Sequence, residues 1–488
     1  MKLRLFVVLL LVPAFVLFSQ DADGGDDTEN GESFGFGSAG ESAAPALGIG
    51  GEVSAKLLGF FDDFGSSGKM RKMQLGDIFE GKLNFSASAK AADGIINLKL
   101  TPEFSGASPI SIDEAFVRLY LGPVDIEGGL RKLTWGRADS FGPLDVINPY
   151  DLSDLSDIGS PRNIKLARPM LHVSWNIGSF SRLEGVFVPW FEGNRYALTG
   201  RWAPVQVTGL PGLVQSDLIN YLIGLGITVN PSDVQPVFDA WTASYDPYPK
   251  TNTFEYAQGG LRFTTTIGVS DLGVQYYFGR LPRPAFAVDI DKPGFFTPAL
   301  PPPLDYTKLD FTKIKIFVDY NYYHQIGVDY ARVIAGFNLR AEAGVNITND
   351  LKGDDGTVYN PHVVWSLGFD RDLIWGINLN LQGNGLVRLM YGKIGDDPLT
   401  DTEAGKDLSS TRITAILSKK FFQDELELKA TALWGIEDKD FLIIPAIVWS
   451  KNDITAELSA GFFGGDKTGE LGQYRDNCYI KTILTWSF

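Results

Sequence analysis

The feature that most constrains this chain is an alternation of apolar and polar residues, which recurs in segments of about ten residues. Every second residue of 453–462 is apolar, and the segments at 82–90, 337–347 and 425–434 follow the same rule. Successive side chains of a β-strand point to opposite faces. Each segment therefore predicts a strand with one apolar and one polar face.

A soluble β-sandwich also alternates, so the faces alone do not decide the architecture. The predicted strands run for about 10 to 14 residues, whereas soluble strands average about 5 to 6. Aromatic residues such as Trp434, Trp449 and Trp486 fall near strand ends, where the girdles of membrane barrels lie. We therefore expect an all-β, transmembrane antiparallel β-barrel of about 18 strands, with 16 as the alternative.

The predicted connections alternate between tight turns and long loops. The tight turns are 91–94, 122–124, 177–180, 269–271, 335–337 and 422–425. The long connections are 62–81, 136–165, 192–255, 281–321, 349–361, 394–407 and 464–477. An even number of strands leaves both chain ends on the same side, as in bacterial single-chain barrels.

The first residues predict export. A charged start, a short apolar core and a small polar edge in 1–20 have the pattern of a cleaved signal peptide, with an uncleaved anchor as the alternative. An acidic Gly/Ser-rich leader, predicted to be disordered, follows at 21–48, and the barrel is expected over 49–488. The single cysteine, Cys478, excludes a lipidated cysteine near the cleavage site and a disulfide within the chain. The expected location is the cell outer membrane.

The last strand has the ending that outer-membrane barrels present to their assembly machinery. Ile480, Leu484, Trp486 and Phe488 share one apolar face, and the chain finishes on an aromatic. An open sheet edge in lipid would leave backbone groups unsatisfied, so this strand is expected to pair with the first.

The polar strand faces predict a wet lumen with charges of both signs. The residues placed on this wall are Lys82, Lys99, Arg118, Arg340, Glu342, Arg412, Glu427 and Lys429. Such charges either create a field that selects solutes or pair with one another and merely keep the interior polar. The sequence leaves both alternatives open.

The alternation stops at Trp135, where a loop rich in Gly, Pro and Asp begins. We expect this loop, 136–165, to fold inward as a constriction, with a cap over the rim as the alternative. Four charged residues are predicted near the narrowest point: Arg131, Arg137, Asp139 and Asp145.

Two stretches of sequence carry a family resemblance. The segment 112–136 resembles paired strands of Gram-negative porins, and the loop is similar to a signature of an uncharacterised family of outer-membrane barrels, in which Trp-Gly precedes Asn-Pro-x-Asp. The matching residues here are Trp135, Gly136, Asn148, Pro149 and Asp151. The resemblance implies an outer-membrane barrel and brings no established substrate.

The insert at 192–255 is too long for a bare loop, and we expect short helices in it on the extracellular side. The first is predicted over 216–226 with Ser216 as its N-cap, and the second over 231–241. An apolar stripe that includes Leu218 and Leu222 is expected to plug the lumen, cover the mouth or bind a hydrophobic ligand. The prolines of 281–321 predict a rigid loop of polyproline character.

Catalysis is not expected. The three histidines, His172, His324 and His362, have no metal spacing, and no nucleophile-elbow motif occurs. We therefore predict no enzyme, no cofactor and no metal. The net charge of −16 argues against nucleic acid as a partner.

Together these features predict a porin-like channel for passive diffusion of small hydrophilic solutes. The alternatives are a transporter of a hydrophobic solute gated by the insert at 216–241, and a surface adhesin or structural barrel without an open pore. The expected partners are outer-membrane lipid, the barrel-assembly machinery and small solutes. A homo-oligomer is compatible with the sequence.

Overall fold

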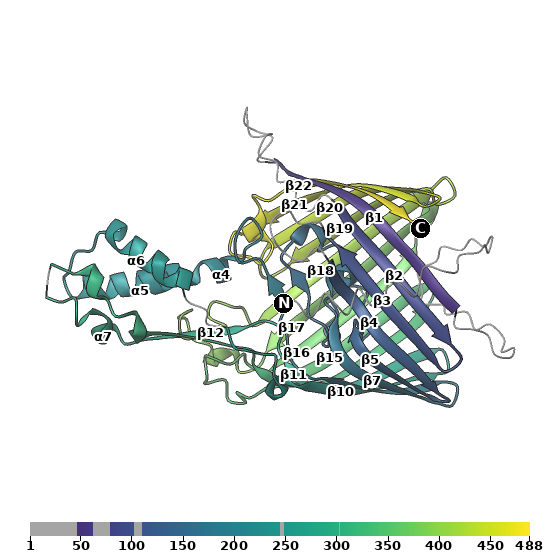
Figure 1. The fold of residues 1–488 in the computed structure, drawn as a ribbon, viewed down its shortest axis with the longest axis horizontal. Helices are drawn as coiled ribbons and strands as arrows, with labels where there is room; N and C mark the ends of the chain where they lie inside the picture. The colour runs from purple at the N-terminus through teal and green to yellow at the C-terminus, as the bar shows by residue number, and fades with distance from the viewer. Residues whose placement is uncertain (1–45, 62–78, 102–109, 245–247, 302) are drawn as a thin grey trace, which may run out of the picture. The chain divides into compact units, whose positions relative to one another are not determined.

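The computed structural model describes residues 46–61, 79–101, 110–244, 248–301 and 303–488. Its dominant element is one antiparallel sheet of 18 strands (Figure 1). The strands are β1 (Ala46–Phe60), β2 (Phe79–Ala89), β3 (Ala92–Leu100), β4 (Ile110–Leu121), β5 (Val124–Arg131), β7 (Arg168–Ile177), β8 (Ser181–Val188), β10 (Gln258–Ile267), β11 (Ser270–Arg280), β14 (Tyr322–Ile334), β15 (Phe337–Thr348), β16 (His362–Asp372), β17 (Ile377–Arg388), β18 (Ser409–Phe421), β19 (Leu426–Gly435), β20 (Asp440–Lys451), β21 (Ile454–Gly465) and β22 (Tyr479–Ser487).

The sheet closes on itself because β22 pairs with β1. Leu484 lies opposite Ala55, and the backbone of Gly51 and Phe488 exchanges two hydrogen bonds of 2.9 and 3.0 Å. Every other strand of the sheet pairs with its neighbours in chain order. Closure leaves no strand edge to be satisfied by lipid. The predicted antiparallel barrel is thus confirmed with 18 strands rather than 16, as is the pairing of the last strand with the first.

The two faces of the wall differ as the alternation predicts. On β14, Ile326 and Val328 face outward and are 54% and 50% exposed, while Gln325 and Asp329 face inward and are 0% and 2% exposed. The outward face also carries Leu484, Trp486 and Phe488. An apolar exterior around a polar interior is the arrangement required of a barrel in lipid. None of the helices in the described ranges is long and apolar enough to cross a membrane.

The connections alternate as expected. The six predicted tight turns each join two paired strands, as at 335–336 between β14 and β15. The long connections lie at the other ends of the strands (Figure 1). Strand β1 begins at Ala46, so the end of the segment predicted as leader belongs to the barrel. The predicted signal peptide, the rest of the leader and most of the loop 62–81 lie outside the described residues.

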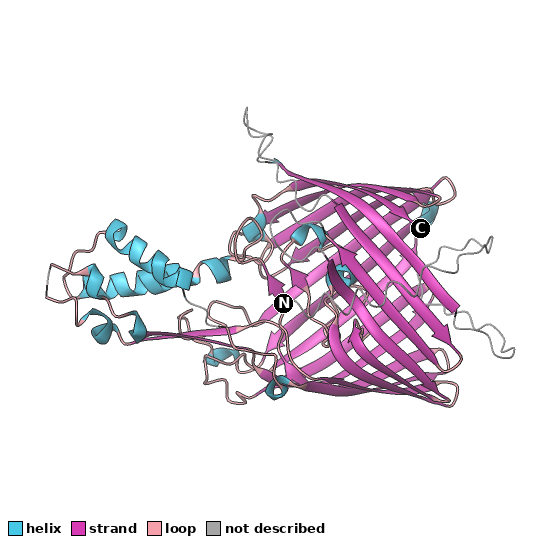
Figure 2. Cartoon of the chain, in the orientation of Figure 1, coloured by secondary structure: helices cyan, strands magenta, loops and turns pink. Residues whose placement is uncertain are grey.

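Two long connections form a helical module beside a small hairpin (Figure 2). The first contains α4 (Val205–Thr208), α5 (Leu210–Gly224) and α6 (Pro231–Ser244). The second contains the antiparallel pair β12 (Ala285–Ile290) and β13 (Ile314–Asp319), with α7 (Lys292–Phe296) between them. The connection 281–321 is therefore not the plain proline-rich loop that was predicted, because apolar and β-branched residues before and after Pro301 pair as strands.

The start of the predicted helix is also wrong. Helix α5 begins at Leu210, six residues before Ser216, and its N-cap is Gly209. Pro211 occupies the first turn, where a missing N–H costs nothing. Ser216 therefore lies inside the helix and does not cap it. The second helix begins as predicted at 231 and runs three residues past 241, to Ser244.

Candidate functional site

The segment 132–167, which joins β5 to β7, lies against the inward faces of strands on both sides of the barrel; we name it the inward loop. Asn148 fixes its two ends: the side chain accepts a hydrogen bond from Leu133 N–H (2.8 Å) and donates to the carbonyls of Arg131 (3.0 Å) and Leu166 (2.8 Å). Pro149 adds a fourth contact through its carbonyl, which accepts from Leu166 N–H at 2.8 Å. The Asn-Pro pair therefore closes the neck of the loop.

Glu342 on β15 anchors the first half of the inward loop. Its carboxylate accepts backbone N–H groups from Arg137, Ala138 (2.8 Å) and Leu144 (3.3 Å). Gln382 on β17 accepts two more, from Asp139 (3.0 Å) and from the next residue of the loop (3.1 Å). The backbone N–H groups of a loop inside a barrel need hydrogen-bond acceptors, and side chains of the wall supply them here.

Trp135 and Gly136 set the direction in which the loop enters the barrel. Trp135 is buried, with its ring edge-on to Tyr277 at 6.3 Å between centroids. Gly136 has φ +89°, and a Cβ at this position would collide with the carboxylate of Glu342. A glycine is needed here for both reasons.

A row of amide side chains on neighbouring strands supports the middle of the loop. Gln275 on β11 donates to the carbonyl of Leu144 (2.9 Å), and Gln325 on β14 donates to that of Pro143 (3.0 Å). Gln275 also donates to Gln325 and Gln325 to Asn346 on β15, each at 2.9 Å. Each amide can donate and accept at once, so the row satisfies itself while it holds the loop.

The second half of the loop binds the opposite part of the wall. Lys56 on β1 contacts Asp154 (3.0 Å) and Asp157 (2.9 Å), and Lys481 on β22 contacts Asp157 (2.8 Å) and the carbonyl of Ser156 (3.0 Å). Burial acts to raise the pKa of Asp157, but the two lysines outweigh it and lower that pKa to about 2. Asp157 is therefore ionised at neutral pH and clamps the loop to the seam where the barrel closes.

The four residues predicted for a constriction lie in two different settings. Arg137 reaches Asp329 (2.7 Å) and Asp271 (3.4 Å) on the inner wall. Asp139 accepts from Arg340 (2.5 Å) and Asn380 (2.9 Å), also on the wall.

Arg131 and Asp145, in contrast, are enclosed, with side chains 11% and 9% exposed. Arg131 pairs with Glu127, and Asp145 accepts from Lys165 (2.5 Å) and Tyr150 (3.1 Å). Burial raises the pKa of Asp145 despite the neighbouring lysine. The structure thus does not bring the four residues into one ring: two lie at the wall and two are packed under the loop.

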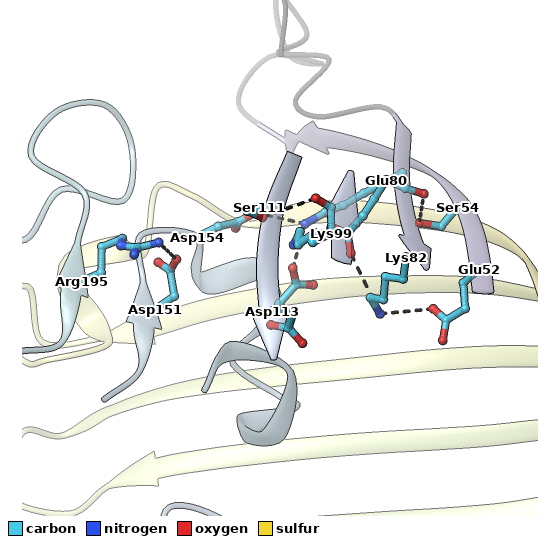
Figure 3. Close-up of polar contacts among 12 residues, drawn as sticks. Glu52, Ser54, Glu80, Lys82, Lys99, Ser111, Asp113, Asp151, Asp154 and Arg195 are labelled. Carbon is cyan, nitrogen blue, oxygen red and sulfur yellow. Dashed lines mark hydrogen bonds and ion pairs between the residues drawn. The ribbon is translucent and has the colours of Figure 1, made fainter. Parts of the chain in front are cut away.

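Most of the predicted wall charges form pairs. Lys82 contacts Glu52 at 3.2 Å and Lys99 contacts Glu80 at 2.6 Å, as Figure 3 shows. The pairs on other strands are Arg118–Glu127, Arg340–Asp370 and Arg412–Glu470. No ion pair is found for Glu427 or Lys429 within the described part of the chain.

Asp151 of the family-like motif joins two loops. It belongs to β6 (Asp151–Leu152), which pairs in parallel with β9 (Arg195–Tyr196) from the following long connection. Its carboxylate accepts from Arg195 at 3.0 Å (Figure 3). The inward loop is therefore tied to the base of the insert 192–255.

The three histidines are separate from one another. His172 on β7 is buried between Glu127 (2.7 Å) and Glu184 (3.3 Å). His324 on β14 bonds Tyr276 on the outward face, while His362 on β16 bonds Asn346 on the inward face. Among the described residues no cluster of His, Cys, Asp or Glu is arranged to hold a metal ion.

The sequence reasoning missed the amide row and the lysine clamp. The signal was present, because the same alternation places Gln275, Gln325 and Gln382 on polar faces near strand centres. Lys56 and Lys481 sit on the polar faces of the first and last strands in the same way.

A cavity of about 230 Å³ remains between the inward loop and strands β18 and β19. Its lining residues are Asp139, Ser140, Ile158, Gly159, Ser160, Pro161, Arg162, Thr414, Ile416, Lys429, Thr431 and Leu433. The loop therefore narrows the barrel and leaves space with polar and charged side chains beside it.

No family model and no curated protein sequence matches this chain. Among solved structures it is similar to the outer membrane protein opdK of Pseudomonas aeruginosa, with 8% identity, a TM-score of 0.47, and coverage of 91% of this chain and 99% of that one. It is similar to OccAB4 of Acinetobacter baumannii, at 7% identity and a TM-score of 0.46 over 92% and 99% of the two chains. It is also similar to OmpF of Salmonella typhi, with 7% identity, a TM-score of 0.39, and coverage of 91% of this chain and 97% of that one. These similarities concern the barrel fold, and no functional conclusion rests on them.

Proposed function

We propose that this protein is an outer-membrane, porin-like channel through which small hydrophilic solutes diffuse passively. The observation that carries the proposal is the inward loop, which occupies part of a polar-lined barrel of 18 strands and leaves a cavity with charged and hydroxyl side chains at its side. Barrels of about 16 to 18 strands are wide enough for an aqueous channel. A loop fixed to the inner wall converts such a width into a narrow, charged passage.

The constriction is proposed to lie between the lumen-facing side of the inward loop and the barrel wall opposite it. Asp139 lines the cavity and is held by Arg340, while Arg137 is held by the aspartates of β11 and β14. Arg131 and Asp145 are proposed to act indirectly, by fixing the neck and the interior of the loop. Passage through such a site needs no chemical step, so no catalytic residue is assigned.

Export through the signal peptide at 1–20 and assembly through the C-terminal residues Ile480, Leu484, Trp486 and Phe488 belong to the same proposal. The outward orientation of these four side chains and the pairing of β22 with β1 support it. Membership in the uncharacterised family with the WG…NPxD signature also stays a proposal. Its support is that Trp135, Gly136, Asn148 and Asp151 each hold the inward loop in place.

Transport of a hydrophobic solute gated by 216–241 receives less support. Leu218 and Leu222 are 1% and 2% exposed because they pack against Phe238, Phe295 and Phe296. The space left among these side chains is about 10 Å³, far too little for an organic ligand. The stripe thus serves as the core of the helical module.

Solute flux into proteoliposomes tests the proposal and separates the three functions. Vesicles that contain the refolded chain 21–488 are expected to swell in isotonic small sugars at a rate that falls with sugar size. Swelling no faster than that of empty vesicles, with the protein folded and inserted, would contradict the channel and support the adhesin or structural barrel. Uptake of apolar solutes alone would favour the hydrophobic transporter.

A further inference from the structure

The cavity beside the inward loop is lined by cations that are not paired with a carboxylate in the described part of the barrel. Arg162 from the loop and Lys429 from β19 both line it, and neither has a carboxylate partner among the described residues. The only acidic residue in the lining is Asp139, whose carboxylate is already engaged by Arg340 and Asn380. The cavity therefore carries an excess of positive charge.

Several cations elsewhere on the described wall are paired with carboxylates. Lys82 and Lys99 pair with glutamates of β1 and β2, and Arg412 pairs with Glu470. On the other side of the lumen, Arg262 and Arg137 share Asp329. Charges that are already paired attract a passing ion much less than unpaired ones do, so the cavity attracts an anion more strongly than these paired positions of the wall.

The other lining groups suit a small organic anion. Thr414, Thr431 and Ser160 provide hydroxyl donors, and Ile158, Ile416 and Leu433 provide an apolar surface for a short hydrocarbon part. A guanidinium offers a planar pair of N–H donors that matches a carboxylate or a phosphate, and an ammonium adds a mobile point charge. The volume of about 230 Å³ is below the range of about 300–1,000 Å³ typical of drug-sized ligands.

We propose that this cavity is a binding site in the solute path for the oxyanion group of a small carboxylate or phosphate, with Arg162 and Lys429 as the binding cations. The inference rests on the proposed channel function and gives it a substrate class. Binding at such a site is weak enough to be reversible because the cavity is open to the lumen and no solute is fully enclosed. An anion therefore concentrates at the cavity and then leaves it.

Single-channel recording with succinate and inorganic phosphate as separate probes tests the site. In the wild-type channel each probe, added in millimolar amounts to a chloride solution, is expected to reduce the chloride current. In the double variant R162Q/K429Q the half-blocking concentration is expected to rise at least about tenfold, because two charge-assisted contacts are lost. Block by succinate alone assigns a carboxylate site, block by phosphate alone a phosphate site, and block by both a general oxyanion site.

K82Q is the matched control, since it removes one luminal lysine that is paired with Glu52 and does not line the cavity. Its half-blocking concentrations are expected to match those of the wild type. Equal block in the wild type and in R162Q/K429Q, or no block by either probe, would overturn the site. A rise in K82Q as large as in the double variant would also overturn it, because the effect would then belong to the lumen as a whole.

The same proteins separate this inference from the channel proposal. A folded wild-type barrel without openings would contradict the channel, and titration calorimetry with succinate and phosphate would then test the cavity alone. Loss of heat in R162Q/K429Q but not in K82Q would keep the site. Folding of each variant barrel is checked by electrophoresis without heating, in which a folded barrel resists sodium dodecyl sulfate.

Discussion

Inside the barrel, the carboxylate of Glu342 receives backbone N–H groups from three residues of the inward loop, Arg137, Ala138 and Leu144. Glu342 is almost fully buried, and so is Leu144, whose N–H therefore lies away from bulk water. Leaving a buried donor unsatisfied costs about 1–3 kcal/mol for each group. The position of the loop thus depends strongly on one side chain of β15.

Glu342→Ala is therefore expected to loosen the first half of the inward loop while the barrel stays folded. The conductance should rise and its open-state noise should increase, because the loop samples positions away from the wall. Glu342→Gln, which keeps an acceptor oxygen, should lie between the alanine variant and the wild type. Unchanged conductance and noise in the alanine variant, measured in planar bilayers, would show that Glu342 does not hold the loop.

Asp157 adds a pH-dependent contact at the other end of the loop. Its pKa of about 2 lies below the ordinary value of 3.8, and the cause is Lys56 and Lys481 acting against burial. A carboxyl whose pKa is lowered in the folded state stabilises that state fully above the ordinary pKa. This stabilisation is lost as the pH falls from about 4 to about 2.

Limited proteolysis of the loop is consequently expected to accelerate between pH 4 and pH 2 in the wild type, with pepsin as the protease because it works in this range. In Asp157→Asn the cleavage rate at pH 4 should already be raised, and its further change toward pH 2 should be smaller. Equal pH profiles for the two proteins would contradict a role for the Asp157 carboxylate.

At the residue scale the sequence predicted faces better than partners. The alternation places Glu342 and Arg340 on the polar side of β15, where their side chains contact Ala138 and Asp139 of the inward loop. It did not predict that Arg137 and Asp139, some 200 positions earlier in the chain, contact β14 and β15. Such contacts depend on the path of a loop, and a loop has no regular sequence period from which its path could be predicted. Arg131 ends strand β5 and Asp145 lies in the inward loop, and their burial against Glu127 and Lys165 cannot be read from spacing.

Among the elements, the helical module differs from the inward loop in having a core of its own. Val214, Leu218 and Leu222 of α5 pack with Phe238 of α6 and Phe295 of α7. Val288 and Ile314 of the β12–β13 hairpin join this core, and among its buried residues in the described ranges Leu399 alone comes from another connection, the one between β17 and β18. The stability of the module is thus expected to be largely independent of that of the barrel.

Phe295→Ala tests this independence. The side chain is fully buried, and removing such a ring costs about 3–5 kcal/mol. The module is expected to become sensitive to trypsin, with cleavage after Lys308 or Lys313, while the barrel keeps its resistance to denaturation and its conductance. A loss of conductance would instead show that the module forms part of the channel. Phe317→Ala, on the exposed side of β13, is the matched control.

The elements that followed the period-two pattern were predictable, and those without it were not. Tight turns such as 335–337 and 422–425 were found because the flanking alternation is uninterrupted on both sides. The start of α5 was missed because Ser216 offers a cap by residue type, whereas the real start uses Gly209 and Pro211. The β12–β13 hairpin was missed because each of its strands is only six residues long and prolines surround them.

For the whole molecule, closure of the sheet by β1 and β22 determines whether a lumen exists at all. Ala55 and Leu484 lie directly opposite each other on these strands. Opposed residues of antiparallel strands have Cα atoms about 4.5–5.5 Å apart, which a disulfide can bridge.

In a Cys478→Ser background, the pair A55C/L484C is expected to form a disulfide in high yield in the folded barrel. The cross-linked protein should unfold more slowly than its reduced form in urea. The pair A55C/L428C serves as the control, because Leu428 lies on β19, which does not neighbour β1. Equal yields from both pairs, measured by electrophoresis without reductant, would contradict the strand order.

The central claim is that the barrel is an open channel narrowed by the inward loop, and single-channel recording of the refolded chain 21–488 in a planar bilayer tests it most directly. We predict stepwise openings of one uniform size, with an increased step in Glu342→Ala as the loop loosens. A protein that is folded and inserted in the membrane but produces no openings would contradict the channel. Uniform openings of the same size in the wild type and in a variant with the loop residues 138–163 replaced by a short Gly/Ser linker would contradict the constriction.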